Sequence, residues 1–441
     1  MESTELAMSP RGQQRETGVA IWILLIFFTA AFFIIEHDFK APEAFQLTMT
    51  AQSVDEYENI NSMFQPRAWR QIAGVAIGLF GVIMLFRRQR GDAHTLDFFG
   101  TLLLFFVGWC ALSLLWADES YITLRRLALF AFLCLGAAGA TGAMEPRHLV
   151  WFALLAPIIY IAAGIGAELY QGTFYPWRTY FRFAGTLHPN AQGVNCAIFF
   201  LAAFSCWKQA QHHRRWWIVL TLIAFVVLYL TKSRTAFASV IAVLIFQYGL
   251  GRDHSRKVAL ASCLMALVVL FFLVGTTILV RTPEGITFRR GGERESFKTL
   301  TGRTALWKQL AEFYKEKPVL GYGYAGFWNE DRTREVIEEQ NWPVPHAHNA
   351  YFDTLLESGP VGMIALILIL VLGIQRAFQY YWRSGNIAYY FFASLLLFCA
   401  LDGFLESVPI QRSMLSFYAM IILVYLAFKK APAPSLPETA P

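Results

Sequence analysis

Long apolar runs separated by short polar connectors make up most of the 441-residue chain. A helix needs about 20 apolar residues to cross the roughly 30 Å core of a bilayer. Applied to this pattern, the rule predicts about twelve membrane-spanning helices, near residues 18–36, 69–87, 95–116, 122–142, 148–169, 190–206, 216–231, 234–250, 258–281, 359–376, 387–405 and 412–428. The sequence therefore predicts an all-α integral membrane protein.

The connectors predict an orientation, because loops on the cytoplasmic side retain Lys and Arg. Basic residues fall in every second connector, for example at Arg87, Arg147 and Arg214. The opposite connectors include acidic segments at 36–58 and 118–119. This alternation places both termini in the cytoplasm.

One polar segment, from about 282 to 358, is too long for a passive connector, since most connections have about 4–6 residues. An amphipathic helix is predicted over 301–315 and a second short helix over 331–340, both lying over the bundle as a lid. The expected organisation is spans one to nine in 1–281, a polar loop in 282–358, spans ten to twelve in 359–430, and a disordered cytoplasmic tail in 431–441.

Composition supports the membrane interpretation. Hydrophobic residues make up 56% of the chain and charged residues 15%, against about 25% in an average soluble domain. The net charge of +6 is carried largely by clusters between apolar runs, so we expect no nucleic-acid partner. The six cysteines lie in or beside apolar stretches without CxxC spacing, which argues against a disulfide framework or a thiolate metal site.

Three arginines depart from the orientation rule by falling on the predicted outer side. They are Arg182, Arg234 and Arg303. A guanidinium offers a fixed fork of donors that suits phosphate oxygens and stays charged at physiological pH. These arginines either form a clamp for a lipid-linked pyrophosphate or serve as ordinary interface anchors and solvated surface charges.

Three histidines lie on the same side: His188 in HPN, and His346 and His348 in HAHN. Imidazole is suited to removing a hydroxyl proton near neutral pH, although a hydrogen-bonded loop histidine is the ordinary alternative. A zinc site is disfavoured, because residues two apart share a face only in a strand and no HExxH is present. We therefore expect no metal and no cofactor.

Two pairs of acidic residues accompany these histidines. Asp353 and Glu357 would share a helix face, where they either orient a histidine or form a solvated helix start. Asp402 and Glu406 are either outward-facing loop charges or members of the cavity.

The stretch HNAYFDTLLESGPVG resembles the signature of the O-antigen ligase and O-antigen polymerase superfamily. In it, His348-Asn349 is followed by nine residues and then by Gly359-Pro360-Val361-Gly362. Supporting segments are Ser233-Arg234, Gly302-Arg303 with downstream Trp307, and PVLGYG at 318–323. The resemblance covers about 180–362.

This resemblance implies an inverting, metal-independent glycosyltransferase of the bacterial inner membrane, with a glycosyltransferase-C-like fold and a periplasmic active site. Its donor would be an O-antigen glycan on undecaprenyl pyrophosphate. By position, His348 would be the general base and Arg234 and Arg303 the pyrophosphate-binding residues. The remaining substrate-binding candidates are Arg182, His188, His346, Asn349 and Asp402.

The acceptor distinguishes three activities in the superfamily. A ligase uses a lipid A–core sugar, a polymerase another lipid-linked glycan, and a protein O-oligosaccharyltransferase a Ser or Thr. The single long loop that ends in His348-Asn349 looks most like a ligase. A transporter or flippase of lipid-linked glycans in the membrane is the alternative from another class; repeated halves and charges deep within the spans would favour it.

Overall fold

A computed structural model describes residues 10–36, 68–86, 96–178, 181–210, 212–252, 303–340, 344, 346–407 and 413–433. Over these ranges the regular structure is helical, with no strand. The helices are α1 (Pro10–Glu36), α4 (Ala68–Phe86), α5 (Phe98–Leu112), η1 (Ser113–Leu115), α6 (Ser120–Ala143), α7 (Pro146–Tyr170), α8 (Pro189–Gln209), α9 (Arg214–Leu230), α10 (Arg234–Arg252), α12 (Arg303–Glu316), α13 (Glu330–Gln340), α14 (Ala350–Ser384), α15 (Ile387–Asp402) and α16 (Met414–Phe428).

The predicted spans can be compared with these helices. Every predicted span within the described residues coincides with a helix, and the span expected at 258–281 lies outside them. Five described helices are long and apolar enough to cross a membrane: Ala68–Phe86, Phe98–Leu115, Ser120–Ala143, Pro146–Tyr170 and Ala350–Ser384. The all-helical membrane character is therefore supported, whereas the number of twelve spans stays a prediction.

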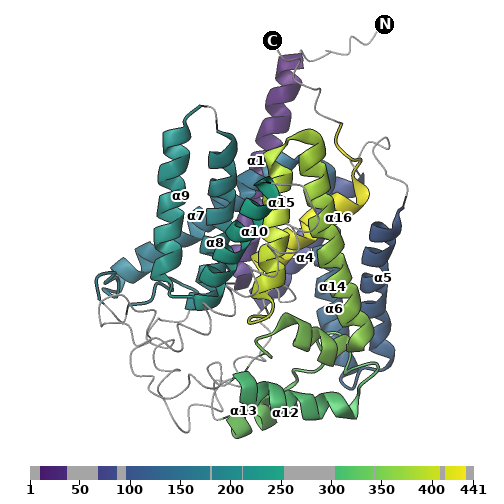
Figure 1. Ribbon diagram of the computed structural model, residues 1–441. Helices are drawn as coiled ribbons and strands as arrows, with labels where there is room; N and C mark the ends of the chain where they lie inside the picture. The colour runs from purple at the N-terminus through teal and green to yellow at the C-terminus, as the bar shows by residue number, and fades with distance from the viewer. Residues whose placement is uncertain are drawn as a thin grey trace, which may run out of the picture.

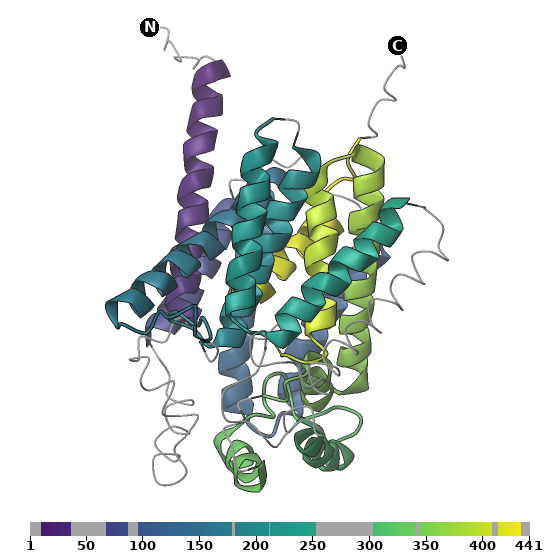
Figure 2. The ribbon, with the colours of Figure 1, turned by 60° about the vertical axis from the view of Figure 1, so that its left-hand side comes forward.

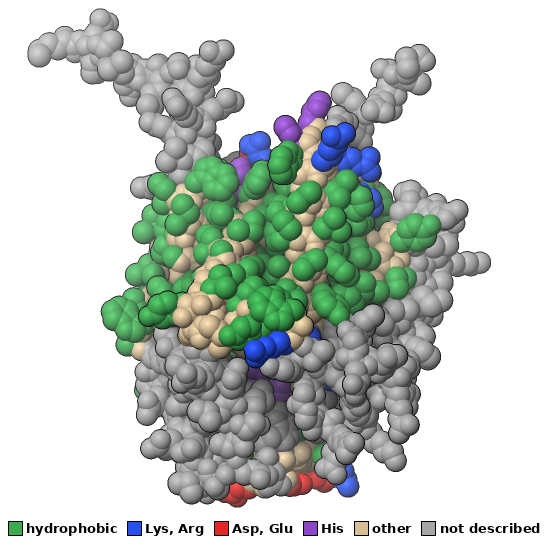
Figure 3. All heavy atoms as spheres, turned by 90° about the vertical axis from the view of Figure 1, so that its left-hand side faces the viewer, with side chains coloured by type: hydrophobic (Ala, Val, Ile, Leu, Met, Phe, Trp, Pro, Cys, Tyr) green, Lys and Arg blue, Asp and Glu red, His purple; other side chains and the backbone are tan. Residues whose placement is uncertain are grey.

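The surface of the bundle matches a lipid environment. Large apolar side chains such as Ile72, Leu104 and Val371 are exposed on its outer helices. Figure 3 shows a broad hydrophobic band on one face, with Lys, Arg and His side chains gathered beyond one edge of it. Apolar exposure on this scale is unusual for a soluble monomer and indicates contact with lipid.

The helices α12 and α13 lie together at one end of the bundle, opposite the end where α1 protrudes (Figures 1 and 2). Both helices were predicted from the sequence, and their apolar faces form a small core with the connecting segment. Its members include Leu306, Leu310, Phe313, Tyr322 and Phe327. A lid function for these helices stays a prediction.

The segment between α12 and α13 is fixed to the corner between α5 and α6. The indole N–H of Trp116 donates to the Leu320 carbonyl at 2.9 Å, and the Tyr324 backbone N–H donates to Ser113 Oγ at 2.8 Å. Arg126 donates to the carbonyl of Trp328 at 3.2 Å. These contacts hold the polar layer against the membrane helices.

The helix α14 changes direction at Gly359, where the backbone adopts φ +68° and ψ −175°. That conformation is essentially restricted to glycine. A Cβ at this position would also collide with the carbonyl oxygen of Val319. The first glycine of the Gly-x-x-Gly signature thus separates residues 350–358, which face the polar layer, from the apolar helix that follows.

Candidate functional site

Five chain segments meet at the end of the bundle that carries α12 and α13. They are the start of α8 with its preceding loop, the turn between α9 and α10, the start of α12, the loop before α14, and the segment after α15. Each segment follows or precedes a helix, so the helix ends fix its position. The predicted residues from separate loops are therefore brought to one place.

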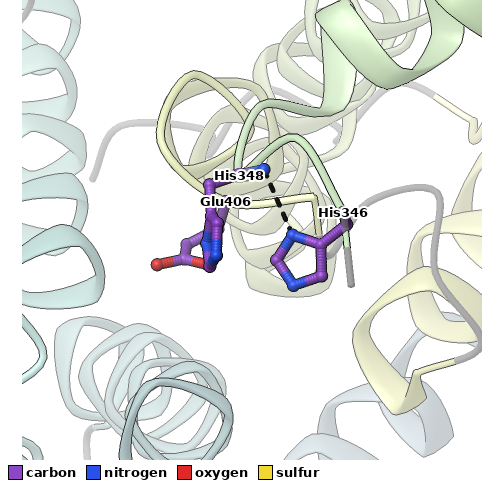
Figure 4. Close-up of side chains that lie close together, drawn as sticks. All are labelled: His346, His348 and Glu406. Atoms are coloured by element: carbon purple, nitrogen blue, oxygen red, sulfur yellow. Dashed lines mark hydrogen bonds and ion pairs between the residues drawn. The ribbon is translucent and has the colours of Figure 1, made fainter. Parts of the chain in front are cut away.

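Glu406 is the centre of this cluster, with a side chain only 5% exposed. Its Oε1 accepts from Arg303 Nη2 at 2.8 Å and from Asn190 Nδ2 at 2.9 Å. Its Oε2 lies 3.3 Å from His348 Nδ1 (Figure 4). One carboxylate thus links the candidate base to a candidate phosphate-binding arginine.

Glu406 is held ionised by its neighbours. Burial alone would raise the pKa of this carboxyl, but the hydrogen bond from His348 and the charge of Arg303 outweigh burial and hold the pKa well below its usual range. A charged acceptor favours the His348 tautomer that carries its proton on Nδ1. In that tautomer, Nε2 of His348 is the ring nitrogen that carries the lone pair.

A second group of cations lies beside α8. Arg182 Nη2 donates to Asn190 Oδ1 at 3.1 Å, and its Nε donates to the Thr231 carbonyl at 3.3 Å. Lys232 is only 8% exposed, and its pKa is lowered by burial and then by the charge of Arg182. Arg234 begins α10 two residues later. The turn between α9 and α10 therefore adds positive charge to the side of the cluster formed by Asn190.

The two histidines of HAHN lie together, with ring centroids 4.1 Å apart. His348 adopts a left-handed φ of 50°, which turns its backbone N–H toward His346 Nδ1 at 3.2 Å (Figure 4). The expectation that residues two apart share a face only in a strand is therefore wrong at this turn. Burial, followed by the neighbouring His348, holds the pKa of His346 well below its usual value.

Asp353 fixes the loop that carries His346 and His348. It is 2% exposed and accepts from Trp328 Nε1 at 2.7 Å and from the Ala347 N–H at 3.0 Å. Its other oxygen accepts from Ser407 Oγ, next to Glu406. The alternative of a solvated helix start is thus wrong for Asp353, which instead ties the histidine loop to the segment after α15.

The signature tryptophan has a related role, because Trp307 Nε1 donates to the Ala347 carbonyl at 2.8 Å. This bond joins α12, and with it Arg303, to the histidine loop. The GR-with-Trp pattern therefore places an arginine and the candidate base on one hydrogen-bonded unit.

His346, His348 and Glu406 could in principle bind a metal ion, since their donor atoms lie within 4.8 Å of one another. The hydrogen bonds do not fit that use. His346 Nδ1 accepts a backbone N–H, so its proton is on Nε2 and neither nitrogen offers a free lone pair. Arg303 already neutralises the carboxylate. These hydrogen bonds thus occupy donor atoms that a metal ion would need, and the absence of a metal stays a prediction.

The other predicted residues have defined positions. His188 caps α8 by accepting from the Asn190 N–H at 3.3 Å. Asn349 caps α14 by accepting from the Phe352 N–H at 2.9 Å, and it donates to the Phe404 carbonyl at 3.2 Å. Asp402 is fully buried, and within the described part of the chain neither of its oxygens has a hydrogen-bond partner.

Sequence reasoning left Glu406, Asn190 and Lys232 out of the site. Glu406 was noted beside Asp402, and an acidic residue just past a span on the same side as His348 was the available signal. Asn190 stands in the HPN motif that supplied His188, and Lys232 stands in the same turn as Arg234.

Comparison with known proteins yields two matches. A family model described as O-antigen ligase matches residues 219–367, about a third of the chain. The exopolysaccharide production protein ExoQ of Rhizobium meliloti (strain 1021) is 36% identical over 78 residues, which are 17% of this chain and 18% of that protein. The match thus spans less than a fifth of the curated relative. The family-model match includes Lys232, Arg234, Arg303 and His348, in agreement with the signature. Both matches support the resemblance of this chain to the O-antigen ligase/polymerase superfamily, which the family model carries over residues 219–367.

Proposed function

We propose that the protein is an inverting, metal-independent glycosyltransferase that moves an O-antigen glycan from undecaprenyl pyrophosphate to a sugar hydroxyl of lipid A–core. The observation that carries this proposal is the contact between His348 Nδ1 and the ionised Glu406. An imidazole oriented through Nδ1 by a carboxylate presents Nε2 as a base.

In the proposed reaction, the acceptor hydroxyl oxygen attacks the anomeric carbon of the donor sugar. Its proton passes to His348 Nε2 as the new C–O bond forms. The bond from the anomeric carbon to the pyrophosphate oxygen breaks with its electron pair on the pyrophosphate. A single displacement of this kind inverts the anomeric centre.

The pyrophosphate would be held by Arg303 and Arg234, with Arg182 as a further contact. Arg303, at the start of α12, and Arg182, in the loop before α8, reach the same Asn190–Glu406 pair, which supports a shared anion site. Charge that develops on the leaving group would be stabilised there by donors already in position. Positioning and electrostatics can then supply most of the rate without a metal.

Lipid A–core is the proposed acceptor, because the polar residues form one extended segment before α14 that ends at His348. The name of the relative from Rhizobium meliloti refers to exopolysaccharide production, which favours a polymerase as the second candidate. In that case the acceptor would be the terminal sugar of another lipid-linked glycan.

The test is reconstitution of purified protein in detergent with undecaprenyl-pyrophosphate glycan and lipid A–core, in parallel reactions with and without EDTA. Wild type should produce glycosylated lipid A–core on a gel. His348→Ala should lose transfer by about 10²–10⁴-fold, the range for a general base. Full activity of this variant would remove His348 from the mechanism.

A matched control is His212→Ala, which changes an exposed histidine between α8 and α9. It should transfer like wild type. Longer lipid-linked glycan in place of glycosylated lipid A–core would move the assignment to a polymerase. Inhibition by EDTA that one divalent ion reverses would contradict the metal-independent mechanism.

A further inference from the structure

Glu406 makes two contacts that serve different steps of the proposed reaction. Its Oε1 neutralises Arg303 at 2.8 Å, where the proposed function places a donor phosphate. Its Oε2 approaches His348 Nδ1 at the longer distance of 3.3 Å. A carboxylate shared in this way supports the base less than one that is bonded to the imidazole alone.

The surroundings of Glu406 are rich in donors for an anion. Asn190 Nδ2 donates to the same Oε1 as Arg303, and Asn190 in turn accepts from Arg182. Lys232, beside Arg182, adds another buried cation. Arg303 and Asn190 hold one carboxylate oxygen in the way that they would hold a phosphate oxygen.

We propose that Glu406 is an internal anion that occupies the place of a donor phosphate on Arg303 and that donor binding displaces it toward His348. The proposal rests on the proposed function, because it assumes that Arg303 binds the donor pyrophosphate. Glu406 is thereby a positioning residue that competes with the donor and couples donor binding to the base.

The physical basis is competition for one guanidinium. A pyrophosphate that bonds to Arg303 takes over the donors that now satisfy Oε1 of Glu406. The released carboxylate is then neutralised mainly by His348, which strengthens the Nδ1–H···O bond and favours the protonated imidazole. His348 consequently becomes a stronger base only after the donor is in place.

The diagnostic experiment is pyrophosphate binding to the full-length protein in detergent, measured calorimetrically for wild type and Glu406→Gln. Removing the competing charge should tighten binding of inorganic pyrophosphate by at least about fivefold, the lower end of typical couplings. In the transfer assay, the KM for the lipid-linked donor should fall and kcat should fall about tenfold or more. A purely structural defect would not tighten binding while slowing turnover.

The control is Glu312→Gln, which removes an exposed carboxylate of α12 that pairs with Lys315. Its pyrophosphate affinity and kcat should equal those of wild type. Unchanged or weaker pyrophosphate binding by folded Glu406→Gln would overturn the proposal.

A second variant covers the case in which Glu406→Gln does not fold. By thermodynamic linkage, removing the imidazole leaves the carboxylate more firmly on Arg303. His348→Ala should therefore bind inorganic pyrophosphate at least about fivefold more weakly than wild type, and equal affinity would contradict the coupling.

Failure of the proposed function would look different. In that case wild type would transfer no glycan in any assay, whatever the pyrophosphate affinities of the variants. If wild type transfers glycan but the pyrophosphate affinity is unchanged in both variants, the coupling through Glu406 is contradicted. The proposed glycosyltransferase function is then unaffected.

Discussion

At the scale of single residues, the candidate site consists of an imidazole, its carboxylate partner and a set of guanidinium groups. The chemistry depends on direction as much as on charge. Arg303 and Arg182 each donate from one Nη to a specific acceptor, so the planar fork already has a fixed orientation. Lysine carries the same charge without that fork.

Arg303→Lys should therefore reduce glycan transfer by at least about tenfold, because one positioned donor to a developing charge is typically worth 10²–10³. Arg234→Lys should act in the same direction. Arg334→Lys, at a half-exposed ion pair with Glu330 on α13, is the control and should be near wild type. Normal kcat in both Arg303→Lys and Arg234→Lys would refute the clamp.

His346 gives a pH prediction. Its pKa in the folded protein is held well below the usual value of about 6.5, so the folded state binds fewer protons than the unfolded chain at mildly acidic pH. Its contribution to stability is present above that usual value and is lost as pH falls toward the folded pKa. Thermal unfolding should occur at lower temperature at pH 5.5 than at pH 7.5.

The variant His346→Asn should show a smaller dependence of thermal unfolding on pH over this range. His212→Asn is the control and should keep the wild-type dependence. An equal pH dependence in all three proteins would show that His346 is not the group that titrates.

How far the sequence predicted the site is clearest for His348 and Glu406. His348 could be named because its signature is local, with the glycine motif nine residues beyond the His-Asn pair. Glu406 lies 58 positions further along the chain. Its partner depends on how α14 and α15 pack, which no local pattern encodes.

At the scale of helices and loops, the polar layer is held largely by hydrogen bonds that have a backbone group on at least one side. The Tyr322 N–H donates to the Leu356 carbonyl at 2.8 Å, next to the break at Gly359. Hydropathy predicted where helices lie, and the Gly-Pro pair coincides with the break. Hydropathy could not predict that residues 318–329 dock on the α5–α6 corner, because that docking depends on hydrogen bonds to backbone groups.

Gly359→Ala is the corresponding prediction. The substitution forces a side chain into a conformation that costs about 1–3 kcal/mol and directs its Cβ at the Val319 carbonyl. Thermal unfolding should shift to clearly lower temperature. Gly166→Ala in α7 is the control, since a Cβ there meets nothing within 4 Å. Equal stability of the two variants would show that the break is not required.

At the scale of the whole molecule, chemistry and lipid contact are separated. The charged network lies at the end that carries α12 and α13, whereas the face of the bundle seen in Figure 3 carries a broad apolar band. The basic connector at the start of α9 lies at the opposite end of that helix from the turn at Thr231. If the orientation rule holds, the network faces the periplasm.

This orientation can be tested by single cysteines in a background without native cysteines. Lys315→Cys on α12 should react with a membrane-impermeant maleimide in intact spheroplasts, because its side chain is 67% exposed on the proposed periplasmic side. Arg214→Cys should react only after permeabilisation. The reverse pattern would invert the topology and place the proposed site in the cytoplasm.

The assembly of the site from five separated segments limits how such a protein can be recombined with its relatives. A chimera that exchanges 303–349 alone would carry a foreign Arg303 and His348 but retain the host's Asn190 and Glu406. We therefore expect that the polar segment cannot be exchanged between relatives on its own with the site intact. Substitutions have more freedom on the outer face of α13, at exposed positions such as Glu335 and Glu338, than on the surfaces that contact Asn190 and Glu406.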